Sequence, residues 1–154
     1  TPMQLAVMTA MFANNGKRIF PTIYKNVHEV NPDDNQVFNT QTLYQKKFFS
    51  LIKSGMFSAV NKPFGTAYGS KTNKLIFAGK TGTVQVRTIS EEEREIGIIA
   101  NKDLPFAQRD HALFVGFAPY KNPKIAVAVV IEHGGSGSKI AAPIAKNIFK
   151  KALL

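Results

Sequence analysis

The chain has 154 residues, enough for one domain of ordinary size, and 44% of them are hydrophobic, which fits a globular protein with a real core. There is no cysteine, which excludes disulfides, thiol catalysis and cysteine-based metal sites. The net charge of +10, carried by 16 Lys and 4 Arg, favours attraction to anionic surfaces, but no nucleic-acid motif accompanies it, so nucleic acid is not an expected partner. The three histidines show no metal-ligand spacing, and we expect neither a metal nor a cofactor.

The first predicted helix begins at Thr1-Pro2, because Thr is a good N-cap and Pro is favoured in the first turn. Three- and four-residue spacing predicts an apolar face made of Leu5, Met8, Met11 and Phe12. The helix is expected to end at residues 14–16, where Gly16 can take a left-handed conformation. Residues 17–30 then look extended, and residues 31–35 form a turn cluster.

A second helix is predicted from Thr40 to Asn61, and Gly55 could break it in two. Its expected apolar face consists of Tyr44, Phe48, Leu51 and Ile52. A glycine-containing loop, residues 62–67, follows the helix.

The stretch from Ile76 to Val86 is typical of a strand, since apolar and β-branched residues run up to it and alternate through it. Gly79 and Gly82 flank Lys80-Thr81, and glycine inside a strand usually indicates that something approaches the backbone closely. A positive charge, hydroxyls and bare N–H groups are what recognition of a carboxylate or an oxyanion requires. The motif alone leaves open an edge strand with a surface lysine.

Residues 87–110 form a long polar connection, whose glutamate run is expected to be a solvated surface. Two strands follow at 111–118 and 124–132, joined by a short turn that makes them an antiparallel hairpin. The second is apolar on both faces and is expected to be central. The glycine-rich residues 134–138 lack the spacing of a phosphate loop. A last helix is predicted over 141–154, with one side made of Ile144, Ile148 and Phe149.

The predicted fold is therefore α+β, with three antiparallel strands near residues 75–87, 111–118 and 124–132 and helices packed against them. No apolar run reaches membrane-spanning length, and we expect the segment itself to be soluble. The chain starts at Thr1 without a Met, so we interpret it as a segment of a longer protein with any targeting element upstream.

Lys80-Thr81-Gly82 matches K-T-G, the third of three motifs, after S-x-x-K and S-x-N, that occur together in penicillin-binding proteins and serine β-lactamases. Further segments stand in a matching order around it: 1–6, 13–17, 54–60, 65–67, 78–85, 111–119, 130–135 and the terminal helix. Together they resemble class B penicillin-binding proteins, and most closely the elongation type, penicillin-binding protein 2. The resemblance implies a larger five-stranded sheet, with two strands N-terminal to this chain.

The resemblance also implies a peptidoglycan D,D-transpeptidase, in which a serine attacks the penultimate D-Ala of a stem peptide and an amine from another stem resolves the acyl-enzyme. β-Lactams acylate the same serine. By analogy, Lys80 attracts the substrate carboxylate, Thr81 and Thr83 bind it through their hydroxyls, and the Thr83 backbone N–H donates to the oxyanion. Gly82 leaves room for the acyl group.

The sequence departs from the family pattern because no convincing nucleophile is present. Ser50 to Lys53 and Ser136 to Lys139 fit S-x-x-K, but the first lies in the segment that resembles the helix before the third motif and the second follows Lys80. No S-x-N triplet occurs. We therefore interpret residues 1–154 as the C-terminal part of one transpeptidase domain, which should not acylate alone.

Two alternatives remain: a D,D-carboxypeptidase or β-lactamase of the same fold, and a non-catalytic basic binding or penicillin-sensor module. The partners implied by the resemblance are peptidoglycan stem peptides, β-lactams, the upstream half of the domain, a membrane-embedded glycan polymerase and elongation-complex proteins. The implied location is the bacterial inner membrane, with the catalytic domain in the periplasm. An incomplete sheet would leave an unpaired edge and an uncovered apolar face, so we expect marginal stability of this piece alone.

Overall fold

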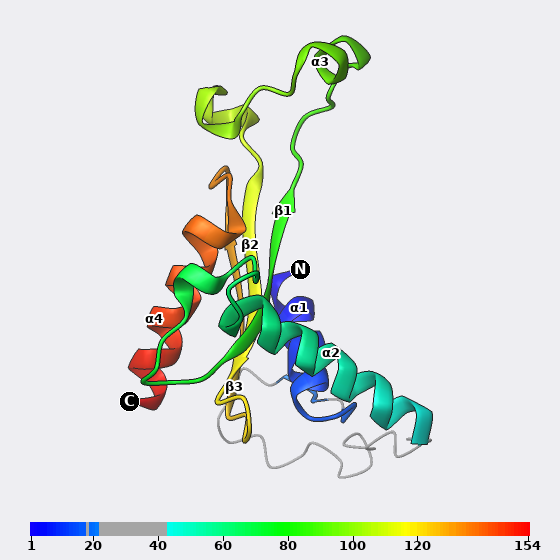
Figure 1. The fold of residues 1–154 in the computed structure, drawn as a ribbon, viewed down its shortest axis with the longest axis vertical. Helices are drawn as coiled ribbons and strands as arrows, with labels where there is room; N and C mark the ends of the chain where they lie inside the picture. Colours follow the sequence, from blue (N-terminus) through cyan, green and yellow to red (C-terminus); the bar gives the residue numbers. More distant parts are fainter. Residues whose placement is uncertain (18, 22–42) are drawn as a thin grey trace.

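The computed structural model describes residues 1–17, 19–21 and 43–154. It confirms the expected α+β class, with helices packed on an antiparallel sheet (Figure 1). The extended stretch expected over residues 17–30 lies largely outside the described residues, and the turn expected at 31–35 lies entirely outside them. The elements, in chain order, are α1 (Pro2–Ala13), α2 (Leu43–Asn61), β1 (Ala78–Val84), α3 (Glu91–Ile96), β2 (His111–Ala118), β3 (Ile125–Ile131) and α4 (Ala142–Leu153).

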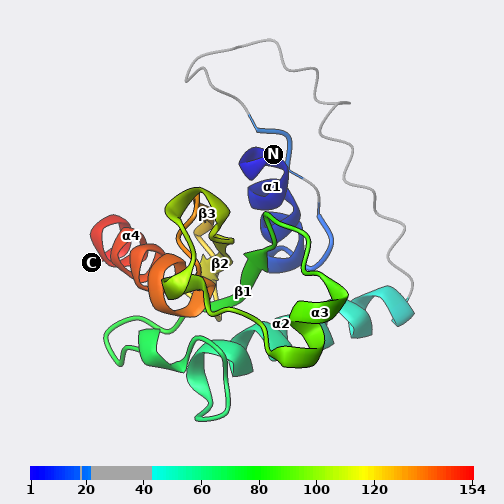
Figure 2. The same cartoon turned by 90° about the horizontal axis from the view of Figure 1, so that it is seen from above.

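The sheet has the order β1-β2-β3, and both pairs are antiparallel, with Lys80 opposite Val115 and Val115 opposite Ala128. Within the described residues β3 lies at an edge of the sheet, so they do not show the central position that was expected. Helix α1 packs on one face of the sheet and α4 on the other (Figure 2). These helices cover both faces of β3, which accounts for its apolar side chains.

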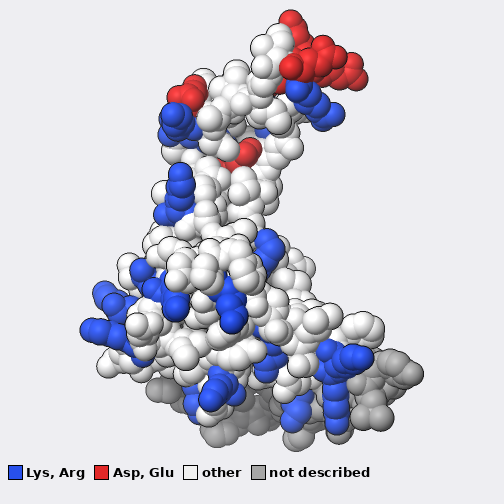
Figure 3. All heavy atoms as spheres, viewed as in Figure 1, with Lys and Arg blue, Asp and Glu red and all other residues white. Residues whose placement is uncertain are grey.

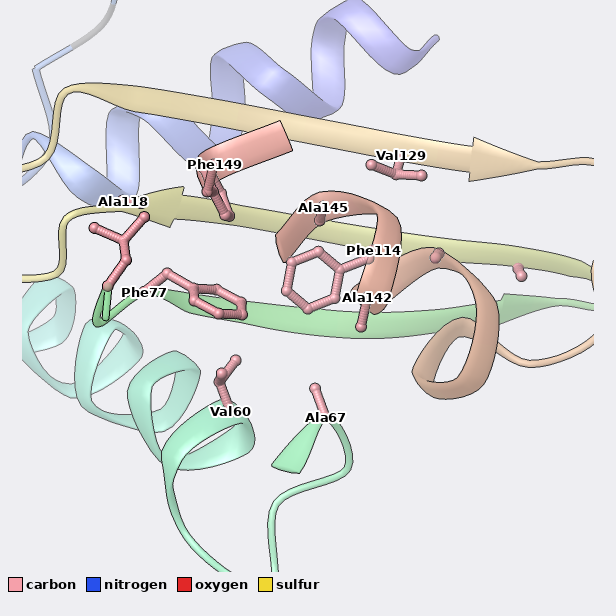
Figure 4. Close-up of a cluster of buried hydrophobic side chains, with 12 residues drawn as sticks. Val60, Ala67, Phe77, Phe114, Ala118, Val129, Ala142, Ala145 and Phe149 are labelled. Carbon is pink, nitrogen blue, oxygen red and sulfur yellow. The ribbon is translucent and has the colours of Figure 1, made fainter. Parts of the chain in front are cut away.

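The main core lies between the sheet and α4 (Figure 4). Its largest side chains are Phe77, Phe114 and Phe149, whose exposed fractions are 0–1%. The Phe77 ring lies 5.3 Å from that of Phe149 and 6.3 Å from that of Phe114, centroid to centroid. Burial of each such side chain contributes about 1.5–3 kcal/mol, so this cluster fixes the position of β1 on its α4 side.

The first helix begins as expected, with a capping box between Thr1 and Gln4 and with Pro2 in the first turn. It ends at Ala13, with Asn14 as the C-cap, and Gly16 follows in a left-handed conformation with φ +96°. The buried residues are Thr9 and Ala13, whereas Met8 of the predicted face is 37% exposed. Small side chains let α1 approach the sheet closely, and the Thr9 hydroxyl is satisfied by donating to the Leu5 carbonyl at 2.7 Å.

The second helix runs unbroken through Gly55, so the expected division was wrong. The predicted apolar face was also wrong in its described part, because Phe48 is 62% and Leu51 69% exposed, while Met56 and Val60 are buried. The N-terminal half of α2 extends past the sheet, and only its C-terminal half packs on β1 (Figure 1).

The last helix has the expected Pro143 in its first turn, preceded by a π-turn at Gly137–Ala141. Its core face consists of Ala142, Ala145 and Phe149, whereas the expected Ile144 and Ile148 are 37% and 40% exposed. Alanines therefore take the place of the predicted isoleucines in the core, because they let the helix axis lie close to the strands.

Residues 85–110, which we call the arm, project beyond the sheet and join β1 to β2 (Figure 1). As expected, most of the glutamate run is exposed, and Glu93 alone of that run is partly buried against Arg87. On the face shown in Figure 3, most of the acidic side chains gather on the arm, where some basic ones accompany them, and Lys and Arg predominate over the rest. Among the described residues, no helix is long and apolar enough to cross a membrane.

Candidate functional site

The K-T-G-T residues lie on β1, which pairs with β2 on one side and has no strand neighbour on the other in the described part of the chain. Close packing explains the first glycine of this stretch: a Cβ on Gly79 would overlap the Phe114 ring and lie 2.6 Å from the Val115 carbonyl oxygen. Gly82 is less crowded, since its Cβ would lie 3.2 Å from Leu113 Cβ. Because Gly82 has no side chain, it leaves the backbone of β1 uncovered at that residue.

Side chains alternate along β1, so Lys80 lies on one face of the sheet and Thr81 and Thr83 on the other. Lys80 is exposed, and its Nζ donates to the Thr81 carbonyl oxygen at 2.7 Å. An ammonium has three donors, so two remain for an anion. Thr83 is exposed as well.

Thr81 is half-buried, and its hydroxyl lies 2.9 Å from that of the exposed Thr66, in the loop after α2, so this contact is open to solvent. This loop was not expected to take part in the site. A threonine immediately before a buried alanine gives no signal by itself; only the fold brings residues 66 and 81 together.

The glycine-rich turn packs behind the same strand. A Cβ on Gly137 would overlap the carbonyl oxygens of Gly82 and Leu113, so the turn approaches the β1–β2 backbone as closely as glycine allows. The Ser136 hydroxyl accepts from the Lys139 backbone N–H at 3.4 Å and lies 3.0 Å from the Ser138 hydroxyl. These contacts give the turn a packing role.

A hollow of about 240 Å³ lies beside Thr83, between β1 and the arm. Its walls combine isoleucine and leucine side chains with polar groups at the base of the arm, among them Asp110. Asp110 accepts from Asn101 Nδ2 at 2.8 Å, and Asn101 Oδ1 accepts in return from the Asp110 N–H at 2.8 Å. This reciprocal pair closes the base of the arm next to the site.

A second pair braces the arm further out, where Arg87 donates to both carboxylate oxygens of Glu93. The hydrogen bonds from the Arg87 guanidinium, and then one from the Ile99 backbone N–H, lower the pKa of Glu93 to about 2. Charge-assisted hydrogen bonds therefore hold the part of the arm that forms the walls of the hollow.

Neither S-x-x-K match makes a nucleophile pair. Lys53 Nζ donates to the Ala13 carbonyl at 3.3 Å and to Asn15 Oδ1 at 3.1 Å, which ties α2 to the end of α1. Lys139 is exposed, and the hydroxyl of Ser136 is used within its own turn. Within the residues that the structure describes, no group of three or more His, Cys, Asp or Glu could hold a metal ion.

The family model described as the penicillin binding protein transpeptidase domain matches residues 1–150. The chain belongs to this family. It is 36% identical, over 94% of its length, to the peptidoglycan D,D-transpeptidase MrdA of Acinetobacter baumannii, and 34% identical, over 96%, to that of Salmonella typhimurium. It spans 21% and 24% of those two relatives.

Solved structures agree with this assignment. A Pseudomonas aeruginosa PBP2 structure, in complex with WCK 5153, matches all of this chain with a TM-score of 0.75 and 38% identity, over 30% of its own length. The PBP2–MreC complex of Helicobacter pylori matches 99% of this chain with a TM-score of 0.74 and 30% identity, over 25% of that chain. The resemblance to class B proteins of the penicillin-binding protein 2 type is thereby confirmed.

Proposed function

We propose that the complete protein is a peptidoglycan D,D-transpeptidase and that this chain is the C-terminal part of its transpeptidase domain. The observation that carries the proposal is the open edge of β1, where K-T-G-T lies in a chain that matches the transpeptidase family over residues 1–150. The nucleophilic serine, the general-base lysine and the S-x-N motif would then lie in the protein outside these residues.

The roles follow from the chemistry of a substrate that ends in a carboxylate. Lys80 supplies a positive charge from one face of the strand, and Thr81 and Thr83 supply hydroxyls from the other, so the carboxylate would bind at the open strand edge between the two faces. The Thr83 backbone N–H would donate to the oxyanion that forms when the serine attacks the penultimate carbonyl. Loss of one such donor typically costs about 3 kcal/mol of transition-state stabilisation. Gly82 would let the acyl group lie against the strand.

The wider setting is proposed by analogy. The relatives named MrdA support peptidoglycan synthesis as the process, and the Helicobacter pylori PBP2 forms a complex with MreC. We infer an equivalent elongation-complex partner, a membrane-embedded glycan polymerase, and a membrane-anchored protein with this domain in the periplasm. β-Lactams would acylate the serine in place of stem peptides.

Acylation by a fluorescent penicillin, followed by intact mass, tests the proposal. We expect the full-length protein to be labelled and residues 1–154 alone to remain unlabelled. Labelling of the short chain would instead make Ser50 or Ser136 the residue to map. If the full-length protein is not labelled either, a non-catalytic module of the same fold becomes the better account of the site.

A further inference from the structure

The hydrogen bond between Thr66 and Thr81 joins the K-T-G-T strand to a segment that the motif does not include. The two hydroxyl oxygens are 2.9 Å apart, and either can be the donor. Thr81 is one of the hydroxyls assigned above to the substrate carboxylate. The orientation of its single hydrogen therefore matters for recognition.

The loop holds Thr66 between two fixed neighbours. Gly65 packs so tightly on the last turn of α2 that a Cβ there would overlap the carbonyl oxygens of Ser58 and Ala59. Ala67 is 1% exposed within the main core, and its N–H donates to the Ala59 carbonyl at 2.8 Å. Its neighbours thus hold the Thr66 backbone opposite Thr81.

The direction of this hydrogen bond is set when an anion binds. A carboxylate only accepts, whereas a threonine hydroxyl has one hydrogen to donate and can also accept. If Thr81 gives its hydrogen to the carboxylate, Thr66 must be the donor to Thr81. That donation holds the Thr81 side chain in place and polarises its O–H, which strengthens it as a donor.

We propose that Thr66 is a positioning residue for carboxylate recognition, which donates to the Thr81 hydroxyl and directs the Thr81 hydrogen toward the carboxylate of a stem peptide or a β-lactam. This inference rests on the proposed function and adds a residue to its carboxylate site.

The test compares two probes on the full-length protein: a fluorescent penicillin with a free carboxylate and its methyl ester. In Thr66→Val, we expect the second-order rate constant of acylation by the free acid to fall about three- to tenfold, the range for one neutral hydrogen bond. The rate with the ester should not change, because the ester has no carboxylate to bind. Thr66→Ser, which keeps the hydroxyl, should restore the wild-type preference.

Thr72→Val is the matched control, because Thr72 lies in the same loop region and its hydroxyl accepts from the Lys74 backbone N–H at 3.3 Å. It should leave both rates unchanged. In a Thr81→Val background, Thr66→Val should have no further effect. If valine at residue 66 prevents folding, Thr66→Ala takes its place in the same comparison.

Three results would overturn the inference: an unchanged free-acid rate in Thr66→Val, an equal loss with acid and ester, or no rescue by serine. Failure of the proposed function gives a different pattern. In that case the wild-type full-length protein is not acylated, or Lys80→Ala leaves the free-acid rate unchanged. A protein that depends on Lys80 but not on Thr66 refutes only the positioning role.

Discussion

In the proposed function, Lys80 is the residue on which the binding of a carboxylate would depend most directly. Its ammonium is exposed and, within the described residues, makes one hydrogen bond, to the Thr81 carbonyl. Hydrogen bonds to charged groups contribute about 1.5–3 kcal/mol, so Lys80→Ala should lower acylation of the full-length protein by a carboxylate-bearing penicillin about ten- to hundredfold. Lys74→Ala, which removes another exposed lysine, should leave the rate within about twofold of the wild type. Equal rates for the two variants would contradict the assigned role.

Gly79 of β1 should not tolerate a side chain without a loss of stability. A Cβ there would overlap the Phe114 ring, which is itself fully buried. Overpacking of this kind typically costs about 1–3 kcal/mol, so Gly79→Ala should lower the urea midpoint of the complete transpeptidase domain. In Gly55→Ala, the new Cβ meets nothing within 4 Å, and the better helix propensity should raise the free energy of unfolding by up to about 1 kcal/mol. A tolerated Gly79→Ala would mean that Phe114 can move.

The sequence predicted Lys80, Thr81, Gly82 and Thr83 as site residues because they are consecutive in the chain and carry the K-T-G motif. Their substrate contacts stay predictions. Thr66 could not be found in the same way, since its contact with Thr81 depends on how the loop after α2 is folded. The same holds for Gly137, whose approach to Gly82 is visible only once the hairpin and the glycine-rich turn are packed together.

Among the elements, the three strands were predicted with small errors: 75–87, 111–118 and 124–132 were expected, and 78–84, 111–118 and 125–131 are observed. Helices α1, α2 and α4 also exist where expected, although their buried faces do not match, whereas the short helix α3 lies in a stretch that was expected to be a connection without a helix. The spacing of apolar residues detects an apolar stripe on a helix. It does not indicate which side of the helix packs against another element. Leu51 of α2 is 69% exposed because that part of the helix extends past the sheet, whereas Ala13 of α1 is buried because its small size allows close packing.

The arm should lose its order in acid. The pKa of Glu93 is lowered from the usual 4.5 to about 2 by the Arg87 guanidinium and then by the Ile99 N–H, which donates at 3.0 Å. Because the folded-state pKa is depressed, the pairing stabilises the arm fully above about pH 4.5 and is lost as the pH falls from 4.5 toward 2. The protection of the Ile99 amide, measured as its exchange rate relative to the intrinsic rate at the same pH, should therefore fall in that window.

Variants separate this effect from general acid unfolding. Glu93→Gln should expose the Ile99 amide to exchange already at neutral pH and remove the extra pH dependence between 4.5 and 2. Glu92→Gln, which removes an exposed carboxylate of the same helix, should behave like the wild type. Ile99 protection that is independent of Glu93 would show that the rest of the arm, such as the Asn101–Asp110 pair, holds the segment.

For the whole molecule, charge is separated along its length (Figure 3). Most lysines lie outside the arm, whereas six of the ten acidic residues lie on it. These six are Glu91, Glu92, Glu93, Glu95, Asp103 and Asp110. Lys80 lies on the strand from which the arm extends. For the anionic substrate proposed above, this distribution would favour approach from the lysine-rich body rather than from the arm.

Residues 1–154 alone should associate with themselves. Phe48, Leu51 and Met3 are 62%, 69% and 52% exposed, and both β1 and β3 are edges of the described sheet. Exposed apolar patches and open strand edges both favour association. We expect a broad thermal transition and a sedimentation coefficient that rises with concentration, whereas the full-length protein should show neither. Replacing Phe48 and Leu51 with Ser should reduce association if the α2 surface causes it and leave it unchanged if the strand edges do. A sharp, cooperative transition from a monomer of residues 1–154 would refute this prediction.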